Sequence, residues 1–131
     1  MGQGSIVNIS SKQKINTRSS AEADVVAVDD GIGPMSWTRY FLEEQGYDVK
    51  DNVLLQDNQS AIKLESNGRA SAGKRSRHMN IRYFFITDVA SKGLVTIQYC
   101  PTDEMDSDYH AKPLQGRKFN KFRCRIMGLP E

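Results

Sequence analysis

The chain has 131 residues, of which 38% are hydrophobic and 26% are charged, and its net charge is +2 at neutral pH. This length favours one domain, residues 1–131, over a multidomain assembly, and the composition is typical of a folded domain rather than a disordered one. No apolar run approaches the roughly 18 residues of a membrane span, and the N-terminus lacks the apolar core of a signal peptide. We therefore expect no membrane association and a cytoplasmic or nuclear location.

Charge and cysteine content narrow the possible partners. Residues 19–66 contain ten acidic and three basic residues, whereas residues 67–131 contain twelve basic and six acidic ones. This asymmetry suits a protein that binds cations at one place and polyanions at another, and it also suits an ordinary solvated surface. Cys100 and Cys124 lack the spacing of a metal site, so we expect both to be reduced and structural.

The first predicted elements are a strand and a long helix. Ser5–Ser10 is short and rich in β-branched residues, which is typical of a strand. Ser19 and Ser20 are good N-caps for a helix whose apolar residues recur at helical spacing until Gly46. Pro34 and the glycines beside it predict either a kink or two helices that meet near residue 33. Helical spacing also predicts that three aromatic residues belong to the core: Trp37, Tyr40 and Phe41.

A second strand and a second helix follow. Val53–Leu55 is a short apolar run that predicts the strand, and Asp57 is the expected N-cap of the helix, which ends near Gly68. A basic loop at residues 68–78 leads to a third helix around Ile81–Val89, which Gly93 ends.

The remaining chain predicts one more strand and two helices. Leu94–Tyr99 is the strand, and Thr102 and Asp103 can cap a short helix toward Ala111. A basic amphipathic helix is predicted by three apolar residues at helical spacing, Phe119, Phe122 and Ile126. We expect its phenylalanines to pack inward and its basic face to be solvated. The element order indicates an α/β domain in which helices cover a sheet of parallel strands. Three short strands are few for so many helices, so we expect an incomplete sheet.

Three carboxylates stand out by their positions. Glu22 lies in the first turn of the long helix, Asp57 at the C-terminal end of a strand, and Asp108 in the short helix. Open α/β sheets bind ligands at the carboxyl ends of their strands, and carboxylate oxygens suit hard cations such as Mg²⁺. Each also has an ordinary explanation: Asp57 as a helix N-cap, Glu22 as an acid favoured by the helix dipole, and Asp108 as part of an acidic run.

Five blocks of sequence resemble, in order, the C-terminal ribonuclease H domain of copia-type retrotransposon polyproteins: SKQKINTRSSAEAD, QDNQSAI, NGRASAGKRSRHMNIRYFF, YCPTDEM and AKPLQG. The resemblance implies a ribonuclease H-like mixed sheet with flanking helices. It also implies an enzyme that uses two Mg²⁺ (or Mn²⁺) ions to cut the RNA strand of an RNA/DNA hybrid. Glu22, Asp57 and Asp108 would be its catalytic and metal-binding residues, because the family's SSTEAE, DNQSAI and ADxFTKPL motifs place acids there.

The sequence also departs from the family pattern. By resemblance, the family's first two strands and one of its four acids lie upstream of this chain, so we expect about three strands and no activity from the chain alone. Ser107–Lys112 replaces the ADxFTKPL pattern, Asp106 occupies a usually apolar position, and Ala21 replaces a threonine. Together with Gly31 and Gly33, these changes suggest a relic that drifts without selection for catalysis.

A cluster of basic residues is the candidate nucleic-acid contact. Arginine and lysine suit phosphate, so we expect the cluster to position the hybrid rather than to recognise its sequence. The alternative is a solvated loop in which the histidine caps the next helix. The residues concerned are Lys74, Arg75, Arg77, His78 and Arg82.

Three hypotheses follow from the sequence. The first is a ribonuclease H domain that needs the rest of a retrotransposon polyprotein. The second is a non-catalytic relic that binds RNA or hybrid in a salt-sensitive way. The third is a transposon fossil that has no stable product, or one that is stable only when another chain supplies the missing strands by β-augmentation.

Overall fold

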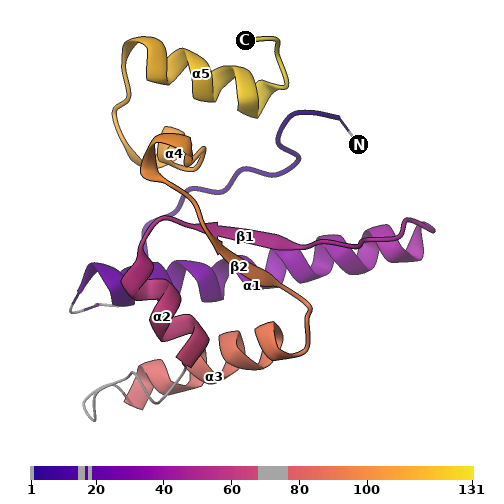
Figure 1. The fold of residues 1–131 in the computed structure, drawn as a ribbon, viewed down its shortest axis with the longest axis vertical. Helices are drawn as coiled ribbons and strands as arrows, with labels where there is room; N and C mark the ends of the chain where they lie inside the picture. The colour runs from indigo at the N-terminus through magenta and orange to yellow at the C-terminus, as the bar shows by residue number, and fades with distance from the viewer. Residues whose placement is uncertain (1, 15–16, 18, 68–76) are drawn as a thin grey trace. The chain divides into compact units, whose positions relative to one another are not determined.

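The computed structural model describes residues 2–14, 17, 19–67 and 77–131. These residues form two compact units, which are described separately (Figure 1). The larger unit is Gln13–Cys100, and the smaller unit combines Met1–Lys12 with Pro101–Glu131. No helix in the described ranges is both long enough and apolar enough to cross a membrane.

The larger unit contains a small parallel sheet and three helices. Helix α1 (Ser20–Glu44) leads to strand β1 (Val53–Gln56) and helix α2 (Gln59–Asn67), and helix α3 (Arg77–Ser91) leads to strand β2 (Thr96–Tyr99). The strands pair in parallel, with Val53 opposite Thr96 and Gln56 opposite Tyr99. Parallel strands need a crossover, and α2 and α3 supply it. The α/β class and the two strands predicted here are confirmed.

The core of this unit is built from all three helices and from the residues that flank the strands. Helix α1 contributes a buried stripe at helical spacing, and α3 contributes Tyr83 and Ile86, which are 1% and 0% exposed. Leu54 and Ile97 pack against this core from the two strands. The other fully packed residues are Val25, Val26, Val28, Ile32, Ala61, Val89 and Val95.

Helix α1 is a single helix that includes Pro34. The predicted alternative of two separate helices is therefore wrong. Proline removes the N–H that would bond to the Asp30 carbonyl, but Asp30 is exposed, so water can solvate that carbonyl. The Thr38 hydroxyl donates a hydrogen bond of 2.8 Å to the Pro34 carbonyl.

The expected core role of Trp37, Tyr40 and Phe41 is wrong. Their exposed fractions are 66%, 52% and 48%. A helix of 25 residues is about 37 Å long, which exceeds the length of its partners, and Figure 1 shows its C-terminal half running past α2 and α3. Trp37 and Phe41 instead stack on each other, with ring centroids 5.3 Å apart.

The N-cap of α1 is the predicted Ser19, whose side chain accepts a hydrogen bond of 3.2 Å from the Glu22 N–H. We expect Ser19→Ala to lower the free energy of unfolding by about 1 kcal/mol, because the cap satisfies a helix donor that has no partner within the helix. Urea denaturation followed by circular dichroism measures this change. The control is Ser20→Ala, one residue inside the helix, and an equal effect of the two changes would contradict the assignment of the cap.

The N-cap of α2 is Asn58, not the predicted Asp57. The Asn58 side-chain oxygen accepts hydrogen bonds from the N–H groups of Ser60 (3.0 Å) and Ala61 (3.3 Å). Its carbonyl accepts the first helical bond, from the Ile62 N–H at 3.1 Å. The cap shifts by one residue because β1 continues through Gln56, which leaves Asp57 as the connecting residue.

The smaller unit contains the 3-10 helix η2 (Thr102–Glu104) and helices α4 (Asp108–Ala111) and α5 (Gly116–Met127). The single short helix expected toward Ala111 is therefore two short pieces. Phe122 of α5 is fully buried, as predicted. The basic face of α5 forms ion pairs in addition to being solvated. Lys118 pairs with Asp103, and both Lys121 and Arg125 pair with Glu104.

The predicted strand Ser5–Ser10 is wrong. These residues have no strand conformation, and Ile6, Val7 and Ile9 are 60–66% exposed. A strand is stable only when a neighbour pairs with it, and the described residues of the smaller unit include no other strand. The segment instead meets the end of α5, where the Ser5 N–H donates to the Ile126 carbonyl at 2.8 Å. The described residues thus contain two strands rather than about three.

Candidate functional site

Glu22 lies in the first turn of α1, where its N–H is held by the Ser19 cap. Its side chain is half-buried. Burial, and then the negative charge of Glu22, raises the pKa of Tyr83 in α3. The predicted acid therefore lies in the first turn of α1, near Tyr83 of α3.

Asp57 lies directly after β1, at the carboxyl end of the parallel sheet, and is half-buried. Ligands of open α/β sheets bind at this end of the strands. Because Asn58 caps α2, the ordinary explanation of Asp57 as an N-cap does not apply.

A hydrogen bond joins the parts of the chain that bear these two acids. The Asn58 side-chain amide donates to the Asp24 carboxylate over 2.9 Å. Asp24 lies two residues after Glu22, and Asn58 follows Asp57. The structure therefore brings the N-terminal end of α1 to the β1–α2 junction within the larger unit.

A buried polar pair behind this junction was missed by the sequence analysis. Glu65 of α2 is 0% exposed and Gln56 is 6% exposed, and the Gln56 amide lies 3.5 Å from one Glu65 oxygen. Within the described part of the chain, the other oxygen of Glu65 is buried without a hydrogen-bond partner. The pKa of Glu65 is raised to about 7, chiefly by burial; the hydrogen bond from Gln56 acts in the opposite direction, and the charge of Asp24 adds to the rise. Helical spacing from Ala61 was the available signal, since it places Glu65 on the buried face of α2.

Asp108, the third predicted acid, belongs to the smaller unit. It begins α4, is 6% exposed, and forms an ion pair with Lys112 over 2.9 Å. Glu22 and Asp57 lie in the larger unit. In the ranges that the structure describes, no cluster of three or more histidine, cysteine, aspartate or glutamate side chains is arranged to hold a metal ion.

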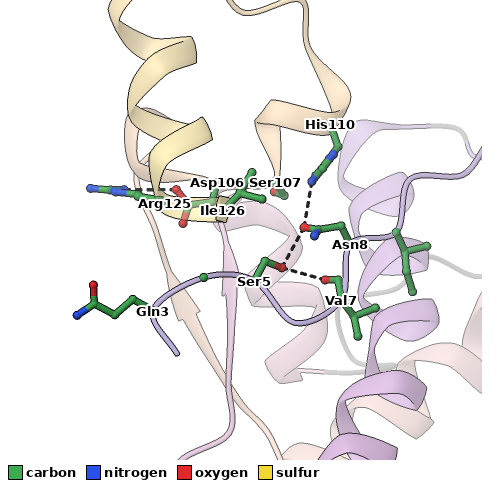
Figure 2. A pocket seen from close by; sticks show the side chains of 11 residues that line it. Gln3, Ser5, Val7, Asn8, Asp106, Ser107, His110, Arg125 and Ile126 are labelled. Carbon is green, nitrogen blue, oxygen red and sulfur yellow. Dashed lines mark hydrogen bonds and ion pairs between the residues drawn. The ribbon is translucent and has the colours of Figure 1, made fainter. Parts of the chain in front are cut away.

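The smaller unit also contains a cavity of about 430 Å³, shown in Figure 2. Its wall combines the N-terminal segment with Asp106, Ser107 and His110, and with α5 at Arg125 and Ile126. Asn8 accepts a hydrogen bond of 3.0 Å from the Ser5 hydroxyl and lies 3.2 Å from the His110 ring. The side chains of Ser5, Asn8 and His110 thus hydrogen-bond to one another.

Only some of the residues predicted to contact nucleic acid belong to the described part of the structure. Lys74 and Arg75 lie outside the described residues, as do the side chains of Arg77 and His78, which begin α3. Arg82 forms an ion pair with Asp29 and lies 3.5 Å from Asp30, so it joins α3 to α1. Burial raises the pKa of Asp29, although the Arg82 guanidinium beside it acts in the opposite direction.

Related proteins point to a mobile genetic element. Over 116 residues, or 88% of its length, the chain is 31% identical to the retrovirus-related Pol polyprotein from transposon TNT 1-94 of Nicotiana tabacum. It is 30% and 29% identical, over 89% of its length, to those from transposons RE1 and RE2 of Arabidopsis thaliana. The chain spans only 8–9% of the length of these relatives. No family model and no solved structure matches it.

These matches support a retrotransposon-derived origin for the chain, as a region related to plant Pol polyproteins. The copia-type resemblance of the sequence blocks agrees with this origin.

Proposed function

We propose that this chain is a ribonuclease H-type region of a retrotransposon polyprotein, whose substrate is the RNA strand of an RNA/DNA hybrid. The proposal includes a ribonuclease H-like mixed sheet, with β1 and β2 as two of its strands. The observation that carries it is the hydrogen bond between Asn58 and Asp24, because it joins the segments that bear Glu22 and Asp57 at the carboxyl end of the sheet.

In this proposal Glu22, Asp57 and Asp108 are the acids that hold Mg²⁺ or Mn²⁺. Their carboxylate oxygens are the ligand type that hard divalent cations prefer. When bound, a pair of such ions stabilises the attacking and leaving oxygens of a phosphodiester. Asp108 forms an ion pair with Lys112, which must open for Asp108 to bind a metal ion.

Basic residues supply the proposed contact with the hybrid. Lys74, Arg75, Arg77 and His78 are the candidates for phosphate contacts, which position a substrate without selecting its sequence. Arg82 has a smaller share in this role, because its guanidinium already pairs with Asp29. Binding that depends on phosphates weakens as the salt concentration rises.

Cleavage of a labelled RNA/DNA hybrid in Mg²⁺ tests the proposal. The assay uses the 131-residue chain and the same chain joined to the segment encoded directly upstream in the same reading frame. We expect cleavage by the extended chain, and a loss of at least about 100-fold on Asp57→Asn, because the amide removes a negatively charged metal ligand. The matched control is Asp51→Asn, an exposed acid before β1, which should change the rate little.

The results of this assay distinguish an enzyme from a protein that only binds the hybrid. Hybrid binding that salt weakens, without cleavage by either chain, would replace the enzyme with a non-catalytic binding module. Cleavage that survives Asp57→Asn would remove Asp57 from the site.

A further inference from the structure

Both the oxygen and the nitrogen of the Asn58 side-chain amide form hydrogen bonds. Its side-chain oxygen caps α2 through the N–H groups of Ser60 and Ala61. Its side-chain nitrogen donates to the Asp24 carboxylate over 2.9 Å, and both residues are half-buried. A cap needs only the oxygen, so the bond to Asp24 is a second and separate contact.

The backbone around Asp57 is fixed by the same set of residues. The Asn58 N–H donates to the Gln56 side-chain oxygen over 3.1 Å, and Gln56 is 6% exposed. Residue 57 therefore lies between two residues whose side chains are anchored, one in the core and the other on α1.

The connection to α1 reaches the N-terminal end of that helix. Asp24 is two residues from Glu22, and both lie within the first two turns of α1, which follows the Ser19 cap. A helix is rigid over two turns, so fixing the position of Asp24 also fixes the backbone that bears Glu22. The bond between Asn58 and Asp24 is thus a direct tie between the start of α1 and the connection that bears Asp57.

We infer that Asn58 is a positioning residue, which sets the placement of Asp57 relative to Glu22 through its hydrogen bond to Asp24. The consequence for metal binding rests on the proposed function, whereas the placement itself does not. A hydrogen bond to a carboxylate is stronger than one between neutral groups, which suits it to holding two elements in register.

An exchange of the two side chains tests this inference. Asn58→Asp keeps an oxygen that can cap α2 but sets two carboxylates against each other. Adding Asp24→Asn to the same chain restores one amide and one carboxylate, with donor and acceptor exchanged. The double variant has the same net charge as the parent chain, so it separates the hydrogen bond from the charge.

The first readout is a distance between α1 and α2. The chain's own cysteines are first replaced by Cys100→Ala and Cys124→Ser. Nitroxide labels are then attached at two exposed positions through Ala27→Cys and Lys63→Cys. Electron paramagnetic resonance then gives the distribution of label distances. We expect a narrow distribution in the parent chain, a broader one in Asn58→Asp, and a narrow one again in the double variant. An unchanged distribution in Asn58→Asp, or no recovery in the double variant, would overturn the inference.

The second readout is the affinity for Mn²⁺, measured on the same three chains. We expect about a tenfold weaker affinity in Asn58→Asp and its recovery in the double variant, as for residues that orient metal ligands. If the Mn²⁺ affinity is the same in all three chains while the label distances change as expected, Asn58 has no consequence for metal binding. Absence of Mn²⁺ binding by both the parent chain and the extended chain would overturn the proposed function, and the distances would still decide the inference.

Discussion

Replacement of Ile86 by alanine is expected to lower the free energy of unfolding by about 2–5 kcal/mol. Ile86 is 0% exposed and lies in the core where α3 packs against α1 and α2. The change removes apolar contacts and leaves a cavity that the surrounding helices fill only in part. Since small domains are stable by only about 5–15 kcal/mol, we expect much of the larger unit to unfold at moderate urea concentrations.

The matched control is Ile81→Ala in the same helix. Ile81 is 76% exposed, so its replacement should change the free energy of unfolding by no more than about 0.5 kcal/mol. Urea denaturation followed by circular dichroism measures both variants. Equal losses at the two positions would contradict the orientation of α3 in this structure.

The second large effect concerns pH. Burial raises the pKa of Glu65 from its ordinary 4.5 to about 7. The folded chain then binds more protons at this residue than the unfolded chain between these two values. Its contribution to stability is therefore complete below pH 4.5 and is lost as the pH rises through about 7. The full loss is on the order of 3 kcal/mol, because one pKa unit corresponds to about 1.4 kcal/mol.

Glu65→Gln is expected to abolish this dependence. Glutamine has nearly the same shape but no charge, so the variant should exceed the parent chain in stability at pH 8 and match it near pH 4. Urea denaturation at pH 4, 6 and 8 measures the difference. Glu44→Gln, at the exposed end of α1, serves as the control. Parallel stability curves for the parent chain and Glu65→Gln would show that Glu65 titrates normally.

Local sequence signals located most of the elements. Ser19 was predicted as a cap and accepts the Glu22 N–H, and Gly93 was predicted to end α3 and has a φ of +70°. A residue without a side chain adopts that angle readily, and a serine oxygen reaches the third N–H of its own helix. Both signals depend on a few neighbouring residues, which explains why they are visible in the sequence.

Two of the wrong predictions concern burial or pairing between distant segments. Trp37 has the spacing of a core residue, but the helix that carries it extends beyond its partners. Ser5–Ser10 has the composition of a strand, but no described strand of its unit pairs with it. Helical spacing and β-branched residues describe one element, whereas exposure depends on what lies against that element.

The candidate site divides in the same way. The strand-to-helix position of Asp57 and the first-turn position of Glu22 were visible in the sequence, and the resemblance named the same residues. The bond from Asn58 to Asp24 spans 34 positions and could not be predicted from spacing. Glu65 was overlooked because an acid in a helix is usually solvated, and only the packed structure buries it.

The sequence by itself determined the order of helices and strands in the larger unit, the residues that begin α1 and end α3, and the relation to retrotransposon polyproteins. Those features follow from local backbone preferences and from side-chain identity, which the chain carries in any conformation. The tertiary structure alone decided which apolar residues are buried, that Asn58 rather than Asp57 caps α2, and that Glu65 lies in the core. Burial and hydrogen bonding across the chain are properties of packed surfaces, and these surfaces exist only once the helices and strands have come together.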